Sequence, residues 1–137
     1  MRSHHVSRVI AADVATVYDF AADLRNLPVW AAGLAQSEVT QEGDALFVES
    51  SMGRVRIQFV ERNSFGVLDH DVTLPSGVVV TNPMRVFSHP NGAEVIFTVR
   101  QIDMTDEEFA RDIAMIEADL DRLAASVVAS SHARGAL

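Results

Sequence analysis

The stretch that decides the fold is TDEEFARDIAMIEADLDRLAASV, residues 105–127. It opens with a capping box, in which the Thr105 hydroxyl and the Glu108 carboxylate accept hydrogen bonds from free backbone N–H groups at a helix start. An apolar stripe follows at spacings of four and three residues: Phe109, Ile113, Ile116, Leu120, Leu123 and Val127. This spacing predicts one amphipathic helix that runs to about residue 131. Asp119 and Arg122 are predicted to lie largely off its apolar face.

Upstream of this helix the hydrophobic pattern is typical of β-strands. Six strands are predicted near residues 37–42, 45–51, 54–62, 66–74, 78–88 and 94–102. Turn residues separate most of them, and Asn91-Gly92 is a strong hairpin signal. Because consecutive hairpins pair strands without long crossovers, we expect an antiparallel meander.

The N-terminal part predicts another strand and two helices. Residues 6–11 alternate as a strand, and Asp13 suits a helix N-cap. Apolar residues then recur at helical spacing: Val14, Val17, Tyr18, Ala21 and Leu24. Pro28 favours the start of a second short helix that carries Trp30 and ends near Gly33.

This order, β-α-α-β6-α, predicts a two-layer α+β fold. A curved antiparallel sheet of about seven strands would wrap the long C-terminal helix. The length of 137 residues fits one domain, with a core over about residues 4–130. Because a strongly twisted sheet is not filled by one helix, we expect a cavity for a small apolar molecule between them.

Composition excludes several classes of partner and site. The formal net charge of -8 disfavours nucleic acid and anionic membranes, and the chain has no cysteine for disulfides or thiolate zinc sites. No apolar run is long enough to span a bilayer, and the first residues are not typical of a signal peptide, so a cytoplasmic protein is expected. No phosphate loop, dinucleotide fingerprint or metal-ligand spacing occurs, so neither cofactor nor metal is predicted.

Five stretches carry a family resemblance: ADVATVYDF (12–20), NLPVW (26–30), RNSFGVLDH (62–70), PMRV (83–86) and GAEVIFTVR (92–100). With the element order, they resemble the START-like SRPBCC superfamily, the helix-grip fold, and within it the small bacterial polyketide cyclase/dehydrase-like branch. The resemblance covers roughly residues 4–130 and implies a cavity for lipids, sterols, hormones or aromatic polyketides. It implies no catalytic motif that can be transferred to this chain.

His70 is the most informative polar residue. Period-two alternation places it on the same strand face as Leu68 and Val72, which is the more apolar face, and turns Asp69 and Asp71 the other way. An imidazole in a cavity can move a proton near neutral pH, so His70 is the candidate catalytic residue. Two alternatives to catalysis remain for His70. It could be a buried histidine that is hydrogen-bonded for structural reasons, or it could contact a ligand without taking part in a reaction.

Further candidate ligand contacts come from several elements. Trp30 could stack on a flat ligand, and Tyr18 could offer a hydroxyl, although both also suit ordinary packing. Asn82 and Met84 lie on one face of their predicted strand, and Arg85 lies on the other.

Some apolar side chains are predicted to line the cavity: Phe97, Phe47, Met52 and Met84. Alternation leaves open which faces Arg85 and Glu49 take; an inward Arg85 could hold a carboxylate, phenolate or enolate. The other histidines, His4, His5, His89 and His132, are interpreted as tail or turn residues. His4 and His5 are neighbours on a predicted strand and should point apart.

Three functions remain open. The first is binding of a small hydrophobic or aromatic, polyketide-like molecule. The second is a cofactor-independent cyclase or dehydratase in which His70 shuttles a proton while Tyr18, Trp30 or Arg85 positions an oxygen. The third is a non-catalytic protein-interaction domain, with a monomer or homodimer expected.

Overall fold

The computed structural model describes residues 1–31, 34, 37–50 and 53–135, with side chains up to residue 131. The helices are α1 (Val14–Ala22), the 3-10 helix η1 (Leu24–Asn26), α2 (Leu27–Trp30) and α3 (Asp106–Gly135). The strands are β1 (Ser3–Ile10), β2 (Glu38–Glu42), β3 (Ala45–Ser50), β4 (Gly53–Phe59), β5 (His70–Thr73), β6 (Val79–Asn82), β7 (Met84–His89) and β8 (Gly92–Arg100). The predicted helix end at Gly33 and wall residue Met52 lie outside these residues, as does the His132 side chain.

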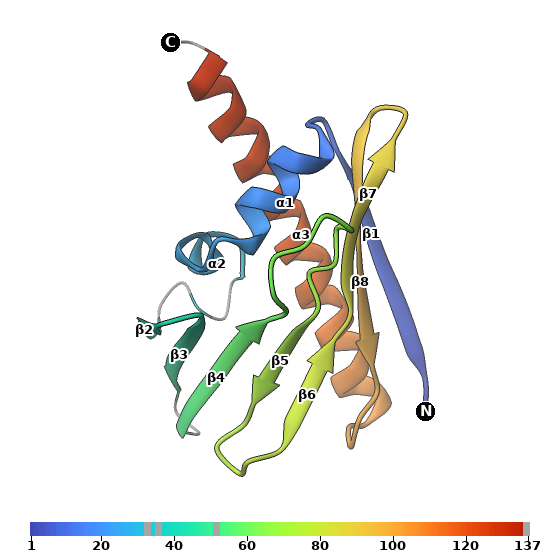
Figure 1. The fold of residues 1–137 in the computed structure, drawn as a ribbon. Coiled ribbons are helices and arrows are strands. Elements are labelled where there is room, and N and C mark those ends of the chain that lie inside the picture. Colours follow the sequence, from blue (N-terminus) through green and yellow to red (C-terminus); the bar gives the residue numbers. More distant parts are fainter. Residues whose placement is uncertain (32–33, 35–36, 51–52, 136–137) are drawn as a thin grey trace.

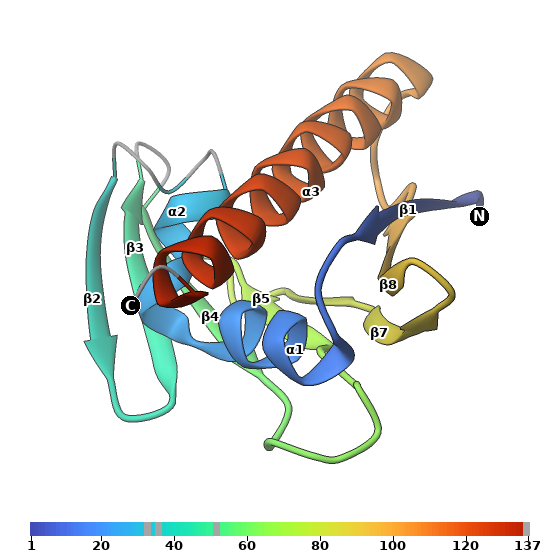
Figure 2. The same ribbon diagram turned by 90° about the horizontal axis from the view of Figure 1, so that it is seen from above.

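The strands form two antiparallel sheets that curve around α3 (Figure 1). One sheet has the order β1-β8-β7 and the other the order β2-β3-β4-β5-β6. Seen from above, β2–β4 lie on one side of α3 and β1, β7 and β8 on its other side (Figure 2). The predicted α+β helix-grip architecture is therefore confirmed.

The sequence signals of α3 act as predicted. The Thr105 backbone N–H donates to Glu108 Oε1 at 3.0 Å, and the Glu108 N–H donates to Thr105 Oγ1 at 3.2 Å. The stripe residues Phe109, Leu120, Leu123 and Val127 are buried in the core. The helix extends to Gly135, a few residues past the predicted end.

The position of α3 is asymmetric. Its backbone packs closely on β1 and β8, and on α1 and α2, but approaches β4, β5 and β6 little or not at all. Its buried side chains join one hydrophobic cluster with residues of both sheets, such as Val95 and Ile57. The five-stranded sheet therefore stands away from the helix, and the intervening space must be filled by side chains or left open.

The predicted strand over residues 78–88 is wrong in one respect: it is two strands in two sheets. β6 ends at Asn82 and β7 begins at Met84, with Pro83 between them. Proline has no N–H for a ladder and is therefore placed at strand ends. This break raises the strand number from the predicted seven to the eight of the structure.

The segment between β4 and β5 also departs from prediction. The predicted strand over 54–62 ends at Phe59, and the one over 66–74 begins only at His70. Residues 66–68 pair instead with β7, where the Leu68 N–H donates to the Met84 carbonyl at 2.8 Å. One continuous stretch thus pairs first with the small sheet and then with the large one, which bends the wall.

The N-terminal helices begin as predicted but are shorter. Asp13 Oδ1 accepts the Thr16 N–H at 2.8 Å, so the N-cap is confirmed. α2 spans only four residues after the single turn of η1, and its Trp30 is buried while Val29 is exposed. None of the described helices is long and apolar enough to cross a membrane.

Candidate functional site

A pocket of about 200 Å³ lies where α3 stands away from the five-stranded sheet. The strands contribute Ile57, His70, Val72, Asn82 and Phe97. α2 and the segment after it contribute Leu27, Trp30, Ala31 and Leu34, and α3 contributes Met115, Ile116 and Asp119. Apolar side chains thus form most of the wall, and a few polar groups from separate elements meet in it.

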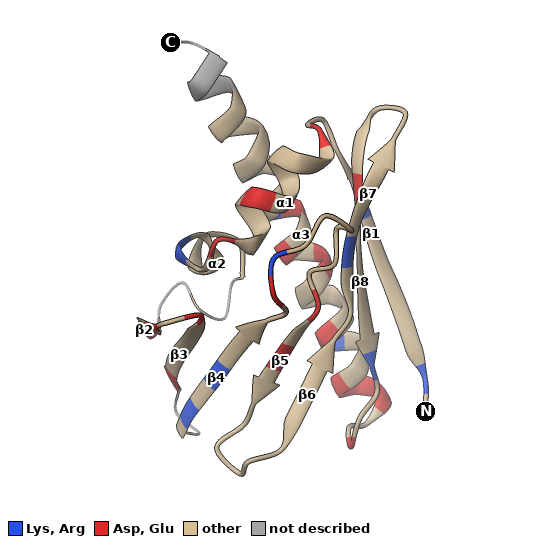
Figure 3. Ribbon diagram, viewed as in Figure 1, with Lys and Arg blue, Asp and Glu red and all other residues tan. Residues whose placement is uncertain are grey.

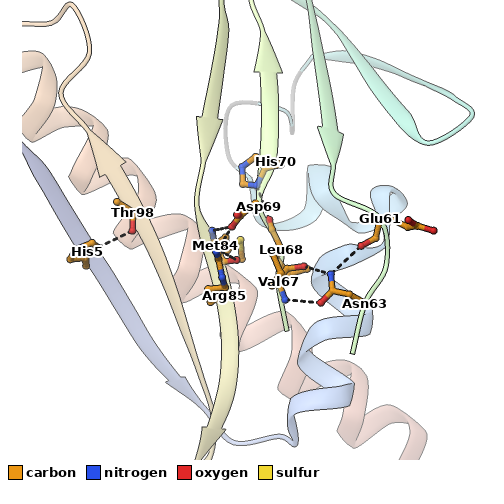
Figure 4. A network of polar contacts seen from close by, with 10 residues as sticks. All are labelled: His5, Glu61, Asn63, Val67, Leu68, Asp69, His70, Met84, Arg85 and Thr98. Atoms are coloured by element: carbon orange, nitrogen blue, oxygen red, sulfur yellow. Dashed lines mark hydrogen bonds and ion pairs between the residues drawn. The ribbon is translucent and has the colours of Figure 1, made fainter. Parts of the chain in front are cut away.

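His70 lies on the sheet side of this pocket and is held there by a hydrogen bond and two aromatic contacts. Only 8% of its surface is exposed, and its Nδ1 lies 3.1 Å from the Leu68 carbonyl oxygen (Figure 4). The ring stacks on Phe59 with centroids 4.7 Å apart and tilts against Phe97 at 5.6 Å. Alternation along β5 therefore predicted its inward direction correctly.

The hydrogen bonds of His70 determine its tautomer. Because a carbonyl oxygen can only accept, Nδ1 carries the hydrogen, and Nε2 of the neutral ring keeps its lone pair. The Asn82 amide nitrogen lies 3.4 Å from Nε2. Burial lowers the pKa of His70 below its ordinary 6.5, although the Leu68 hydrogen bond and the charges of Asp69 and Asp71 act in the opposite direction. His70 is therefore a neutral hydrogen-bond acceptor at pH 7.

Trp30 forms the helical side of the pocket. Only 3% of its surface is exposed, and its indole N–H has no hydrogen-bond partner among the described residues. Its backbone carbonyl accepts a hydrogen bond from Arg122 Nε at 3.2 Å, which ties α2 to α3. The backbone at Trp30 is thus tied to α3, while the buried indole donor has no partner among the described residues.

Asp119 is a pocket residue that the sequence reasoning missed. It was predicted to lie largely off the apolar face of the helix, but only 6% of its surface is exposed and it lines the pocket. Its carboxylate pairs with the Arg122 guanidinium one turn away. A signal was present, because Asp119 follows Ile116 by three residues and precedes Leu123 by four, so all three share one helical side.

The structure brings together Trp30, His70, Asn82 and Phe97 of the predicted ligand contacts. Tyr18 does not line this pocket: its hydroxyl accepts the backbone N–H of Asn63 at 2.9 Å. Tyr18 stabilises the loop between β4 and β5 instead. This agrees with the alternative packing role that its place on the apolar face of the helix indicated.

Met84 and Arg85 also lie outside the pocket. Met84 is fully buried in the core. The Arg85 guanidinium pairs with the Asp69 carboxylate on the other side of the strand, because Met84 and Val86 take the inner face (Figure 4). The idea that Arg85 holds a ligand anion in this pocket is therefore wrong. Glu49 is exposed and pairs with Arg54 at 3.3 Å.

Charges outside the pocket are dispersed. Arginines occur singly or in pairs over several strands and helices, among more numerous acidic residues (Figure 3). In the described part of the chain, no group of three or more His, Asp or Glu side chains has the arrangement of a metal site. Of the described lining residues, Asp119 carries the only formal charge when His70 is neutral.

The sequence matches a protein-family profile over most of its length. Residues 1–128 match the profile of the family described as "Polyketide cyclase / dehydrase and lipid transport". No curated protein matches the chain.

Solved structures resemble the chain over most of its length. Protein CV1439 from Chromobacterium violaceum has a TM-score of 0.69 at 14% identity, covering 93% of this chain and 98% of its own. The Aha1 dimer from Colwellia psychrerythraea gives 0.72 at 13% identity, covering 93% and 96%. DynU16, a protein of the dynemicin biosynthetic locus, gives 0.66 at 15% identity, covering 89% of this chain and 45% of its own. These likenesses establish a shared fold.

Proposed function

The chain belongs to the polyketide cyclase / dehydrase and lipid transport family, and from this membership and the pocket geometry we propose that it binds a small hydrophobic or aromatic molecule. The ligand would occupy the space between the five-stranded sheet and α3. Family and fold both suggest hydrophobic ligand binding. We further propose that this ligand is polyketide-like. The structural likeness to DynU16, a protein of the dynemicin biosynthetic locus, supports this.

One observation carries the proposal: α3 packs on β1 and β8 but stands away from β4–β6, and the resulting pocket is lined mostly by apolar side chains. Ligand sites in proteins have this character, with a largely apolar wall and a few polar groups that fix orientation. His70, Asn82 and Asp119 are such groups.

The single tryptophan of the chain makes the proposal directly testable. Because Trp30 lines the pocket, its indole N–H resonance in a ¹⁵N-labelled protein reports on that site alone. Titration with toluene, phenol and 2-naphthol is expected to shift this resonance saturably with at least one probe.

Two variants control this titration. Ile116→Phe adds volume inside the pocket and is expected to weaken the binding, whereas Val29→Phe on the exposed side of α2 should leave it unchanged. If none of the probes shifts the indole resonance, the proposed binding function is refuted.

A second candidate is an enzyme in which His70 moves a proton. The unprotonated Nε2 beside Asn82 supports it, because a neutral imidazole in an apolar pocket can accept a proton from a carbon next to a carbonyl. Incubation with acetophenone in D₂O tests this chemistry. Methyl deuteration that is faster than in buffer and lost in His70→Phe is expected; equal rates in the two proteins would rule His70 out as the base.

Several expectations from the sequence stay predictions. They are a single domain over residues 1–137, a cytoplasmic location, the choice between monomer and homodimer, and the alternative of a protein-interaction domain. Light scattering over a range of concentrations would decide the oligomeric state.

A further inference from the structure

The volume of the pocket suits a small occupant. Its volume of about 200 Å³ lies below the 300–1,000 Å³ that is usual for drug-sized ligands. An apolar cavity of about 150 Å³ is known to hold one benzene molecule. The space between α3 and the five-stranded sheet therefore matches one ring with a small substituent rather than a multi-ring skeleton.

The polar groups of the wall include two acceptors besides the indole N–H of Trp30, which has no partner among the described residues. Nε2 of His70 has a lone pair, because Nδ1 faces the Leu68 carbonyl. The Asn82 amide nitrogen lies 3.4 Å from this Nε2, which is long for a hydrogen bond. The Nε2 lone pair is therefore only weakly engaged by the protein. Asp119 adds a carboxylate on the opposite wall. A ligand hydroxyl, which both donates and accepts, would complement this set better than a group that only accepts.

The buried carboxylate also sets the charge of the ligand. The donors of Arg122 are directed to the Asp119 carboxylate and the Trp30 carbonyl, and Arg122 is not among the described lining residues. A ligand anion would lie near the Asp119 carboxylate; the paired Arg122 guanidinium weakens the repulsion but does not remove it, because the carboxylate lines the pocket and the guanidinium does not. An uncharged ligand avoids this repulsion.

We propose that the pocket selects a compact, uncharged, one-ring molecule that carries a hydroxyl or N–H donor, and that this donor is bound by Nε2 of His70. The inference rests on the proposed binding function and specifies its ligand class. Phenol is the simplest probe of this chemistry. Toluene lacks the donor, 4-phenylphenol exceeds one ring, and benzoate is charged and also lacks a donor.

Phenol and toluene have nearly the same shape, so their comparison isolates the donor. In a pocket without an acceptor, toluene binds more tightly, since phenol loses the hydration of its hydroxyl without compensation. With His70 as acceptor, phenol is expected to bind several-fold more tightly than toluene, as measured through the Trp30 indole resonance at pH 7. His70→Phe keeps an aromatic ring against Phe59 and removes the acceptor, so this order should reverse.

Benzoate and 4-phenylphenol test charge and size. Neither should give a saturable shift with the wild-type protein. Asp119→Asn removes the charge at nearly constant shape and is expected to strengthen benzoate binding at least tenfold. Asp121→Asn is the matched control, because Asp121 is exposed, pairs with Arg8 of β1 and is not among the described lining residues of the pocket; it should leave benzoate excluded.

The outcomes separate this inference from the proposed function. If toluene or 4-phenylphenol binds as tightly as phenol, or benzoate binds to the wild-type protein as well as phenol does, the ligand class is wrong while the binding function stands. If no probe binds, both are wrong. Because the wild-type comparison needs no variant, the inference remains testable even if His70→Phe fails to fold.

Discussion

The carboxylate of Asp69 accepts the backbone N–H of Met84 at 2.9 Å, where the chain passes from the five-stranded sheet into the three-stranded one. Pro83 lies directly before Met84 and cannot itself donate to a ladder. The same carboxylate oxygen pairs with Arg85. Asp69 therefore holds the sheet junction together, and its neighbour His70 is turned into the pocket because successive side chains of a strand point to opposite faces.

Replacement of Asp69 tests this junction. Asp69→Ala leaves the Met84 N–H without its acceptor and is expected to lower the free energy of unfolding by about 1–3 kcal/mol. Arg85→Met removes only a partly exposed ion pair and should cost less than about 1 kcal/mol. Urea denaturation followed by circular dichroism measures both. Equal losses in the two variants would show that the ion pair, not the backbone bond, supports the junction.

Gly66 provides a second test of this junction, because it lies against Val86 of β7. Its φ of +73° is unfavourable for other residues, and an added Cβ would lie 2.0 Å from the Val86 carbonyl oxygen. Gly66→Ala is therefore expected to lower the unfolding free energy by at least about 3 kcal/mol or to prevent folding.

Gly43 is the matched control, since it has φ of +62° but no atom within 4 Å of the added Cβ. Gly43→Ala should cost only about 1–2 kcal/mol. Thermal unfolding of both variants compares the costs, and similar melting temperatures would contradict the close approach of Gly66 to β7.

The pH dependence of stability should report the burial of His70. Because burial lowers its pKa in the folded protein, the unfolded chain binds the proton more readily below the ordinary value of 6.5. Stability is then complete above pH 6.5 and declines on acidification until the lowered folded pKa is passed, by at most about 1.4 kcal/mol per pH unit.

His70→Phe separates this contribution from the other titrating groups. Denaturant unfolding at several pH values between 7 and 5 should give a steeper loss for the wild-type protein than for the variant. Asp69, Asp71 and the pocket carboxylate of Asp119 remain in both proteins. Parallel profiles would mean that His70 is protonated as readily when folded as when unfolded.

Tyr18 distinguishes a packing role from a ligand role. Tyr18→Phe removes the hydroxyl that accepts the Asn63 N–H and should lower the unfolding free energy by about 1 kcal/mol. The affinity for phenol should not change, because Tyr18 lies outside the pocket. A several-fold change in that affinity, measured by the Trp30 indole resonance, would place the hydroxyl in the binding site after all.

Much of the fold could be predicted because its signals are local. The capping box at Thr105 and the four-three spacing of Phe109 to Val127 specify a helix without reference to the rest of the chain. Alternation around His70 likewise specified which way its side chain points. Such patterns repeat within a few residues, about every 3.6 residues in a helix and every two in a strand, so they can be recognised without knowledge of distant contacts.

What the sequence did not reveal depends on contacts between distant segments. At the split near Pro83 the Asp69 carboxylate accepts the Met84 N–H, and the same carboxylate pairs with the outward Arg85, 16 residues away in the chain. The Asn63 loop, which ends the predicted strand early, is stabilised by the hydroxyl of Tyr18.

The sequence by itself determined most of the elements, their order and the inward direction of His70, because periodicity records which face of each element is apolar. Only the tertiary structure decided where the open space lies. α3 packs on β1 and β8 and not on β4–β6, so Asp119 faces a pocket while Met84 is enclosed in the core. The physical reason is that side-chain periodicity shows which face of an element is buried. Whether that face contacts other side chains or a cavity depends on how the layers pack against one another.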